Sequence, residues 1–249
     1  MKQKIYITPL LALLFLVGYT ATVSMMYPNT LRMMESNCWT EDYVLQFFRW
    51  PVVGAFLMAL PMCAAMLLAA LLLRLCRLPR LMPLSLAVAL ALAYLYPPSA
   101  EYEWGEDKLF NQKLHQQEQL HRYTRMAASR LWNELQRTIR RDGTATSKLG
   151  MQYMLLAESA NGTLAENLFA YPINETEDFL SRGLSTIVAC EFNRLFYDNI
   201  GVWDECFHQA QEYSMSLPRF SLHSLSHMID YSIKEAEWAV AEKLLTVLG

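Results

Sequence analysis

The stretch PVVGAFLMALPMCAAMLLAALLL, residues 51–73, decides the fold class of this protein because it contains no charged side chain. A helix of roughly 20 apolar residues crosses the hydrocarbon core of a membrane, which is about 30 Å thick. Two more uncharged apolar runs lie on either side of it, at residues 5–25 and 81–96. The sequence therefore predicts a membrane domain, residues 1–98, built on three transmembrane helices.

The first apolar run also fits a second interpretation, a secretory signal peptide that is cleaved from the mature protein. Lys2 and Lys4 precede the run, as basic residues do in signal peptides. Residues 20–24, TATVS, provide small side chains for a cleavage site. We favour a retained helix, because the run is longer than the apolar region of a typical signal peptide.

Basic residues indicate how the predicted helices are oriented, because short cytoplasmic loops are enriched in lysine and arginine. Arg74, Arg77 and Arg80 lie between the second and third runs, and Lys2 and Lys4 begin the chain. Both segments are therefore expected in the cytoplasm. An odd number of spans carries the remainder of the chain across, so we expect an inner-membrane protein with a periplasmic C-terminal domain.

The remainder of the chain, residues 99–249, has a different composition. The first 98 residues contain 3 acidic and 7 basic side chains, so this part contains 21 acidic against 14 basic ones. An acidic domain lacks the basic face that binds a phosphate backbone, so we expect no nucleic acid among its partners. The partner that the membrane domain implies is the lipid bilayer.

Helical periodicity continues through residues 99–249, and no stretch alternates with the period of a strand. Helices are expected at residues 104–141 with one break near the middle, 147–160, 163–169, from 179 or 184 to 199, 202–213, 221–233 and 237–248. Short links between helices favour antiparallel neighbours. The predicted fold class is all-α, with transmembrane helices followed by an extracytoplasmic domain of helical hairpins.

Two segments of this domain align as copies 35 residues apart. Residues 201–206, GVWDEC, match residues 236–241, AEWAVA, so that Trp203 aligns with Trp238 and Cys206 with Ala241. Tetratricopeptide arrays repeat in this way, with a period of about 34 residues. We interpret these four residues as repeat-packing positions in a binding module, while an ordinary helical bundle stays the alternative.

Several stretches of the chain resemble a known family. They are Leu155–Ala157 with Gly162–Leu164, Leu168–Pro172, Trp203–Cys206 and Ala239–Leu245. In these stretches, and in residues 27–48, the chain is similar to an uncharacterised Bacteroidota family of multi-spanning membrane proteins. The resemblance implies a membrane-embedded front and a tetratricopeptide-like rear, and it supplies neither a catalytic residue nor a cofactor.

His223 and His227 stand four residues apart on one expected helix, with Asp230 three residues further on. This is a spacing that metal ligands use. Ser224, however, occupies the place where a metalloprotease carries its glutamate. We favour a polar helix face here, with a metal site as the alternative, and we expect no cofactor.

Other polar constellations have a structural interpretation. His115, Glu118 and His121 lie on the long polar helix and are interpreted as a solvated face. Cys190 and Cys206 lie about five residues out of register across the turn at residues 200–201, an offset of roughly 7 Å that is too long for a disulfide. We expect both cysteines to be packing residues.

The function expected from the sequence is that of a membrane-anchored helical-repeat protein that binds or scaffolds another envelope protein. The alternative is a membrane enzyme or transporter acting on a lipid-linked or envelope glycan, with Glu41 or Asp42 as its carboxylate. Both acids lie in the loop between the first two runs. A helix start explains them equally well, because acidic residues stabilise the first turn, and an enzyme is the less favoured class.

Overall fold

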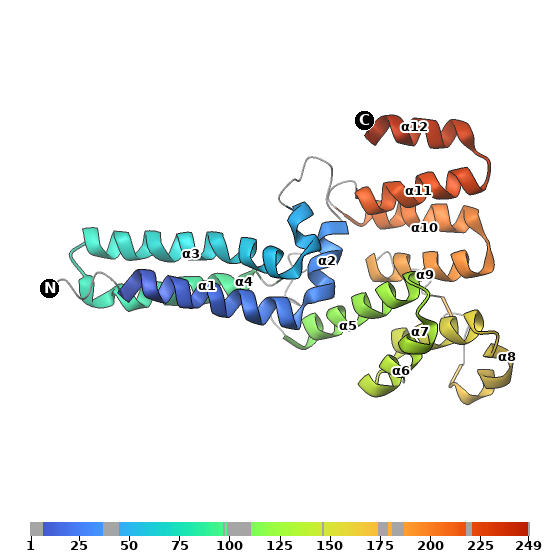
Figure 1. Ribbon diagram of the computed structural model, residues 1–249, viewed down its shortest axis with the longest axis horizontal. Helices are drawn as coiled ribbons and strands as arrows, with labels where there is room; N and C mark the ends of the chain where they lie inside the picture. The colour runs from blue at the N-terminus through green and yellow to red at the C-terminus, as the bar shows by residue number, and fades with distance from the viewer. Residues whose placement is uncertain are drawn as a thin grey trace. The chain divides into compact units, whose positions relative to one another are not determined.

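The computed structural model describes residues 7–36, 45–96, 98, 111–145, 147–173, 179–180, 187–217 and 221–248. Every regular element in these ranges is a helix (Figure 1), which confirms the all-α prediction. The chain divides into two compact units, and the division falls within α5 (Asn111–Ala128), after Gln116.

The first unit contains two long apolar helices, α1 (Ile7–Met26) and α3 (Pro51–Leu75). The shorter helices α2 (Pro28–Ser36), η2 (Leu45–Arg49), η3 (Pro79–Leu84) and α4 (Ser85–Leu95) complete it. Helix α3 packs against both α1 and α4. Ala12, Met66 and Ala89 are buried together where these helices meet, and the two alanines allow close approach of the backbones.

By length and composition, α1 and α3 could cross a membrane. Only 17% of the apolar window of α1 and 28% of that of α3 is buried, so most of each window is at least partly exposed. The core helix of a soluble protein would show the opposite. Leu14, Val17, Leu68 and Leu75, for example, are all more than half exposed.

The third predicted span, residues 81–96, forms two segments. Pro79–Leu84 is a 3₁₀ helix, and only the 11 residues Ser85–Leu95 are α-helical. Pro83 lies inside the first segment, and a proline supplies no N–H to an α-helical ladder. Helix α4 alone rises only about 16 Å, and the two segments together rise about 28 Å, close to the thickness of a hydrocarbon core.

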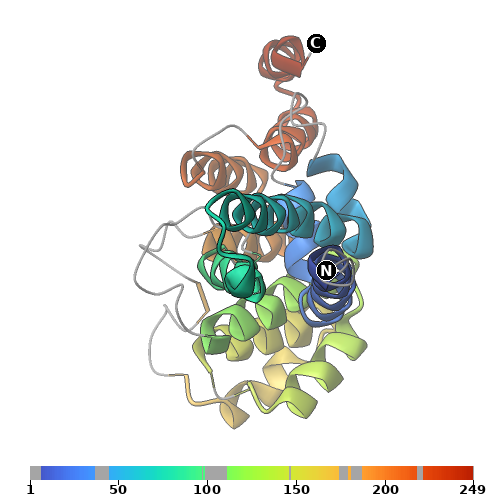
Figure 2. The same cartoon turned by 90° about the vertical axis from the view of Figure 1, so that its left-hand side faces the viewer.

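The second unit contains α6 (Trp132–Asp142), α7 (Lys148–Ala160), α8 (Leu164–Asn167) and η5 (Leu168–Ala170). They are followed by α9 (Ile187–Ile200), α10 (Trp203–Met215), α11 (Leu222–Lys234) and α12 (Trp238–Leu248). Helices α9, α10 and α11 each pack on the helix that follows in the chain (Figure 1). Figure 2 looks nearly along the axes of α11 and α12, so these helices appear end-on, one next to the other.

Local signals in the sequence set several helix ends where they were expected. Ser147 caps α7 by accepting a hydrogen bond from the N–H of Gly150 at 3.1 Å. Gly143 ends α6 with a φ of 69°, a left-handed conformation that glycine adopts without strain. The break expected within residues 104–141 falls at Arg130, whose φ is 55°.

The core of the second unit is aromatic. Tyr153 of α7 is fully buried, and its ring lies 5.0 Å from that of Phe192 on α9 and 6.0 Å from that of Tyr123 on α5. Both contacts are edge-to-face, the arrangement that aromatic rings prefer. The Tyr153 hydroxyl is satisfied by Thr124 at 2.6 Å. This core holds α5 and α7 against α9, a helix that also carries buried polar side chains.

Candidate functional site

An ion pair is buried between α9 and α11. Glu191 and Arg194 are 3% and 5% exposed, and the guanidinium grips both carboxylate oxygens, with Nη2 to Oε1 at 2.5 Å and Nε to Oε2 at 3.0 Å. The remaining Arg194 Nη1 donates to the Tyr231 hydroxyl at 2.7 Å. Burying charges is tolerated only when they are paired and hydrogen-bonded, as they are here.

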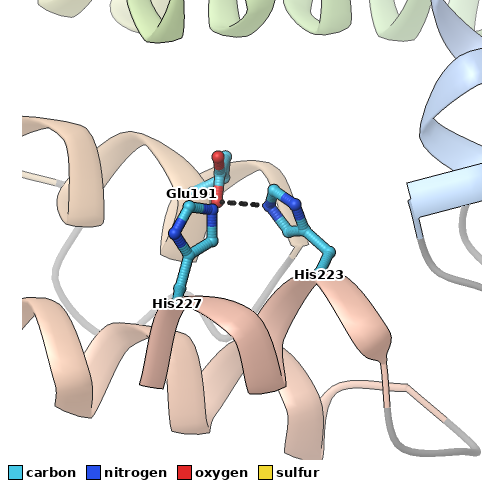
Figure 3. A group of neighbouring side chains, drawn as sticks. All are labelled: Glu191, His223 and His227. Atoms are coloured by element: carbon cyan, nitrogen blue, oxygen red, sulfur yellow. Dashed lines mark hydrogen bonds and ion pairs between the residues drawn. The ribbon is translucent and has the colours of Figure 1, made fainter. Parts of the chain in front are cut away.

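Two histidines of α11 face this carboxylate (Figure 3). The Nε2 of His223 lies 3.3 Å from Glu191 Oε2. The ring of His227, one turn later, meets that of His223 edge-on with a centroid separation of 4.5 Å. One ligand atom from each of Glu191, His223 and His227 lies within 4.8 Å of the others. These three residues form the candidate functional site.

The charges around the site determine its protonation. Burial alone would raise the pKa of Glu191, but Arg194 and His223 outweigh it and hold that pKa well below its ordinary value. Burial and the Arg194 charge lower the pKa of His227 to about 3. Glu191 is therefore ionised and His227 neutral near pH 7, which are the forms that bind metal ions.

The site differs from the constellation expected from the sequence. Asp230 is exposed and does not belong to the group, and Glu191 supplies the carboxylate instead. Glu191 lies 32 residues before His223. No spacing rule connects residues so far apart, and only the packing of α9 on the later hairpin brings them together.

The interpretation of Glu118 and His121 as a solvated face is wrong. They are 7% and 4% exposed, because α5 packs this side into the second unit. Among the residues that the structure describes, none is a hydrogen-bond partner of His121 Nδ1. Burial lowers the pKa of His121 to about 4, against the opposing charge of Glu191. The side chain of His115 lies outside the described residues.

The turns before Trp203 and Trp238 have the same backbone geometry. Gly201 and Ala236 both adopt positive φ, at 75° and 59°, and Gly162 does so at 74°. In all three turns the next residue donates its N–H to the carbonyl five positions earlier, at 3.0, 2.8 and 2.9 Å respectively. A hydrogen bond to the carbonyl five positions earlier also ends α5 and α6. The turn itself therefore does not distinguish the two copies from other helix ends.

The copies are distinguished by a tryptophan after the turn and a small buried residue three positions later. Cys206 is fully buried on α10, and Ala241 is 4% exposed at the equivalent place on α12. Trp203 stacks on Tyr231 of α11 with a centroid separation of 6.2 Å, and the Nζ of Lys234 lies 4.1 Å from the Trp203 ring. Trp238, by contrast, is 63% exposed.

Comparison with known families gives a match that includes every helix from α5 to α12. Residues 98–249 match the model of a family of unknown function (DUF6057). The chain belongs to that family. The DUF6057 region contains Glu191, His223 and His227 as well as both tryptophan copies. No curated protein and no solved structure matches the chain.

A second buried carboxylate in the DUF6057 region joins α7 to the segment after it. Glu158 is 3% exposed and accepts hydrogen bonds from Thr163, from Asn167 at 3.0 Å and from Tyr171 at 3.2 Å. Burial raises the pKa of Glu158, but these bonds lower it further, so the net shift is downward. Thr163 and Tyr171 belong to the stretches that carry the family resemblance. By hydrogen-bonding to Glu158, they fix the segment after α7 against the end of that helix.

The cysteines of the DUF6057 region are packing residues, as expected. Cys190 and Cys206 are buried free thiols. Burial raises their pKa values to about 11 and about 12, so neither is a thiolate at neutral pH. Glu41 and Asp42, the carboxylates of the enzyme alternative, lie outside the described residues.

Proposed function

We propose that this DUF6057 protein is a membrane-anchored helical-repeat module that binds another protein at the cell envelope. The observation that carries the proposal is the different burial of two equivalent tryptophans. Trp203 is covered by Tyr231 and Lys234 of the next helix. Trp238 follows the same kind of turn, yet it is exposed.

Trp238 has one apolar neighbour on the surface of α12. Leu245 follows it by seven residues, about two helical turns, so both side chains lie on the same face, where they are 51% and 63% exposed for Leu245 and Trp238 respectively. Exposed apolar groups of this kind are typical of protein-interaction sites, and tryptophan is enriched among the residues that dominate binding energy. The face of α12 that carries Trp238 and Leu245 is therefore the proposed binding surface.

The occupant proposed for this surface is an amphipathic helix of a second protein. Within this chain, α11 covers Trp203 with an aromatic ring and a lysine one turn apart. Since α10 and α12 repeat the same pattern, a partner helix that offers an aromatic residue and a cation one turn apart fits Trp238 in the same way. Tetratricopeptide-like arrays bind partners through such exposed helical surfaces.

The membrane part of the proposal is that α1 and α3, with the residues 79–95 segment, anchor the module in the inner membrane of a bacterium. Support comes from their outward-facing apolar side chains and from Arg74 and Arg77 at the end of α3. The orientation proposed is a cytoplasmic N-terminus and a periplasmic DUF6057 region.

Site-specific photocrosslinking in native membranes tests the binding function. A photoreactive amino acid replaces Leu245 in the full-length protein. The expected result is one discrete crosslinked species, identified by mass spectrometry, whose yield falls at least about tenfold when Trp238→Ala is added. The matched control places the photoreactive residue at His208, which is exposed on α10 away from the proposed surface.

Two outcomes would count against the binding function. One is a crosslink at residue 245 that persists undiminished in the Trp238→Ala variant, and the other is a pattern identical to that from residue 208. Trp238→Ala is expected to leave folding intact, because the side chain is mostly exposed, and the helical circular dichroism signal checks this.

A further inference from the structure

The group formed by Glu191, His223 and His227 has the composition of a transition-metal site. It offers two imidazole nitrogens and one carboxylate oxygen, the donor set found in many catalytic zinc centres. The histidines lie one helical turn apart on α11, so their side chains project in the same direction. Glu191 comes from α9, a neighbour in space.

The distances suit a small divalent ion. In a tetrahedral site with ligand atoms about 2.1 Å from zinc, any two ligand atoms are about 3.4 Å apart. His223 Nε2 and Glu191 Oε2 are already 3.3 Å apart. The remaining separations are within 4.8 Å, so binding an ion requires the ligand atom of His227 to move closer to the other two. We propose that Glu191, His223 and His227 bind Zn²⁺.

The neighbouring residues orient the carboxylate for this role. Arg194 grips both oxygens of Glu191 and is itself held by Tyr231. A carboxylate has about four lone-pair sites, so the arginine fork leaves Oε2 able to accept a further partner. Such outer partners are common at metal sites, where they fix the ligand and tune its affinity.

The proposed site leaves one coordination position of the ion without a protein ligand. Three protein ligands leave a fourth position for water or another small ligand, which distinguishes this site from a closed structural zinc site. Arg194 already neutralises the charge of Glu191, so the ion brings two uncompensated positive charges. An anionic fourth ligand, such as hydroxide, is therefore favoured. The side chain of His223 is 23% exposed, which provides the route from solvent.

This site is separate from the proposed binding surface on α12, and its test does not depend on a partner protein. The full-length chain is purified in detergent with an affinity tag that contains no histidine, stripped with EDTA and titrated with ZnCl₂ by calorimetry. The expected result is one Zn²⁺ per chain. His223→Gln and His227→Gln each lower the affinity at least about tenfold, while His208→Gln, an exposed histidine of α10, leaves it unchanged.

The proposal is overturned if the wild-type protein binds no Zn²⁺, or if the two ligand variants bind as well as the His208→Gln control. The titration of the wild-type protein decides the proposal even if a variant fails to fold. The zinc X-ray absorption spectrum of the loaded protein is expected to show two imidazole ligands and light oxygen neighbours. A spectrum with sulfur ligands, or without two imidazoles, would reject this site.

Discussion

Arg194 and Glu191 stand one turn apart on α9 and form two parallel hydrogen bonds, 2.5 and 3.0 Å long, in a place where neither residue is more than 5% exposed. Pairing makes this burial possible, because either charge alone would face a large desolvation penalty. The pair also meets α11 through Tyr231 and His223. It therefore helps to determine how the later hairpin docks on α9.

Breaking one half of this pair should destabilise the protein more than replacing both halves. Arg194→Met leaves the Glu191 carboxylate buried without its partner, and we expect a loss of about 3–5 kcal/mol in the free energy of unfolding. The double variant Glu191→Leu/Arg194→Met removes both charges and should recover most of that loss. Denaturant unfolding of the full-length protein, followed by circular dichroism, measures both. Equal losses in the two variants would contradict the prediction.

The two equivalent turns predict opposite effects of exchanging glycine and alanine. Ala236 holds a φ of 59°, where a Cβ is strained by roughly 1–2 kcal/mol. Ala236→Gly should therefore raise the free energy of unfolding by about 1 kcal/mol, and Gly201→Ala should lower it by a similar amount. A Cβ on Gly201 would meet its nearest atom, on Trp203, at 3.8 Å. Since that is ordinary contact, backbone strain alone should produce the loss, and thermal unfolding of the two variants tests it.

The two tryptophans should differ sharply in their contribution to stability. Trp203→Ala removes a ring stack with Tyr231 and a cation–π contact with Lys234, so we expect a loss of about 2–3 kcal/mol. Trp238→Ala removes a mostly exposed side chain and should change the free energy of unfolding by less than about 0.5 kcal/mol. Denaturant unfolding of both variants measures the difference. Comparable losses would mean that Trp238 is buried in the folded protein and unavailable to a partner.

Acid should destabilise the second unit through His121. Burial lowers the pKa of His121 to about 4, whereas an unfolded histidine titrates near 6.5. Above pH 6.5 both states are neutral, so the full stability is present. As the pH falls from about 6.5 to 4, the unfolded state binds a proton that the folded state does not. The expected loss is on the order of 3 kcal/mol.

The pH dependence of His121 is isolated by substitution. His121→Phe removes one of two buried histidines, because the pKa of His227 is also lowered, to about 3. The slope of the stability profile between pH 6.5 and 4, measured by thermal unfolding at fixed ionic strength, should therefore fall by about half. His208→Gln replaces an exposed histidine and should leave the wild-type profile unchanged. An unaltered slope in His121→Phe would show that another group controls this pH range.

Helix ends were predictable because they depend on neighbours along the chain. Ser147 accepts a hydrogen bond from Gly150 only three residues later, and Gly143 needs only its own freedom at positive φ. The third apolar run shows the limit of that reasoning. Its composition predicted one continuous helix over residues 81–96, but the residues up to Leu84 belong to a 3₁₀ helix that contains Pro83. An apolar composition indicates that a segment avoids water, but it does not indicate whether the backbone hydrogen bonds of an α-helix continue through the whole segment.

The candidate site was only half visible in the sequence. His223 and His227 were recognisable because helical spacing is local, but the third residue chosen by that rule, Asp230, faces solvent. Glu191 and His121 carried no local signal, and a polar helix such as α5 suggests solvent on every side. Their burial arises from other helices packed over them.

The sequence by itself determined the all-α class, the positions of most helix ends, the two long apolar helices and the paired turns before Trp203 and Trp238. These features depend on side-chain chemistry within a few residues and on helical periodicity. The tertiary structure alone decided that Glu191 joins two histidines of α11, that Arg194 is buried with it, and that Trp203 is covered while Trp238 is exposed. Each depends on contacts between helices far apart in the chain, and such contacts are set by the packing of whole helix faces, which no local pattern encodes.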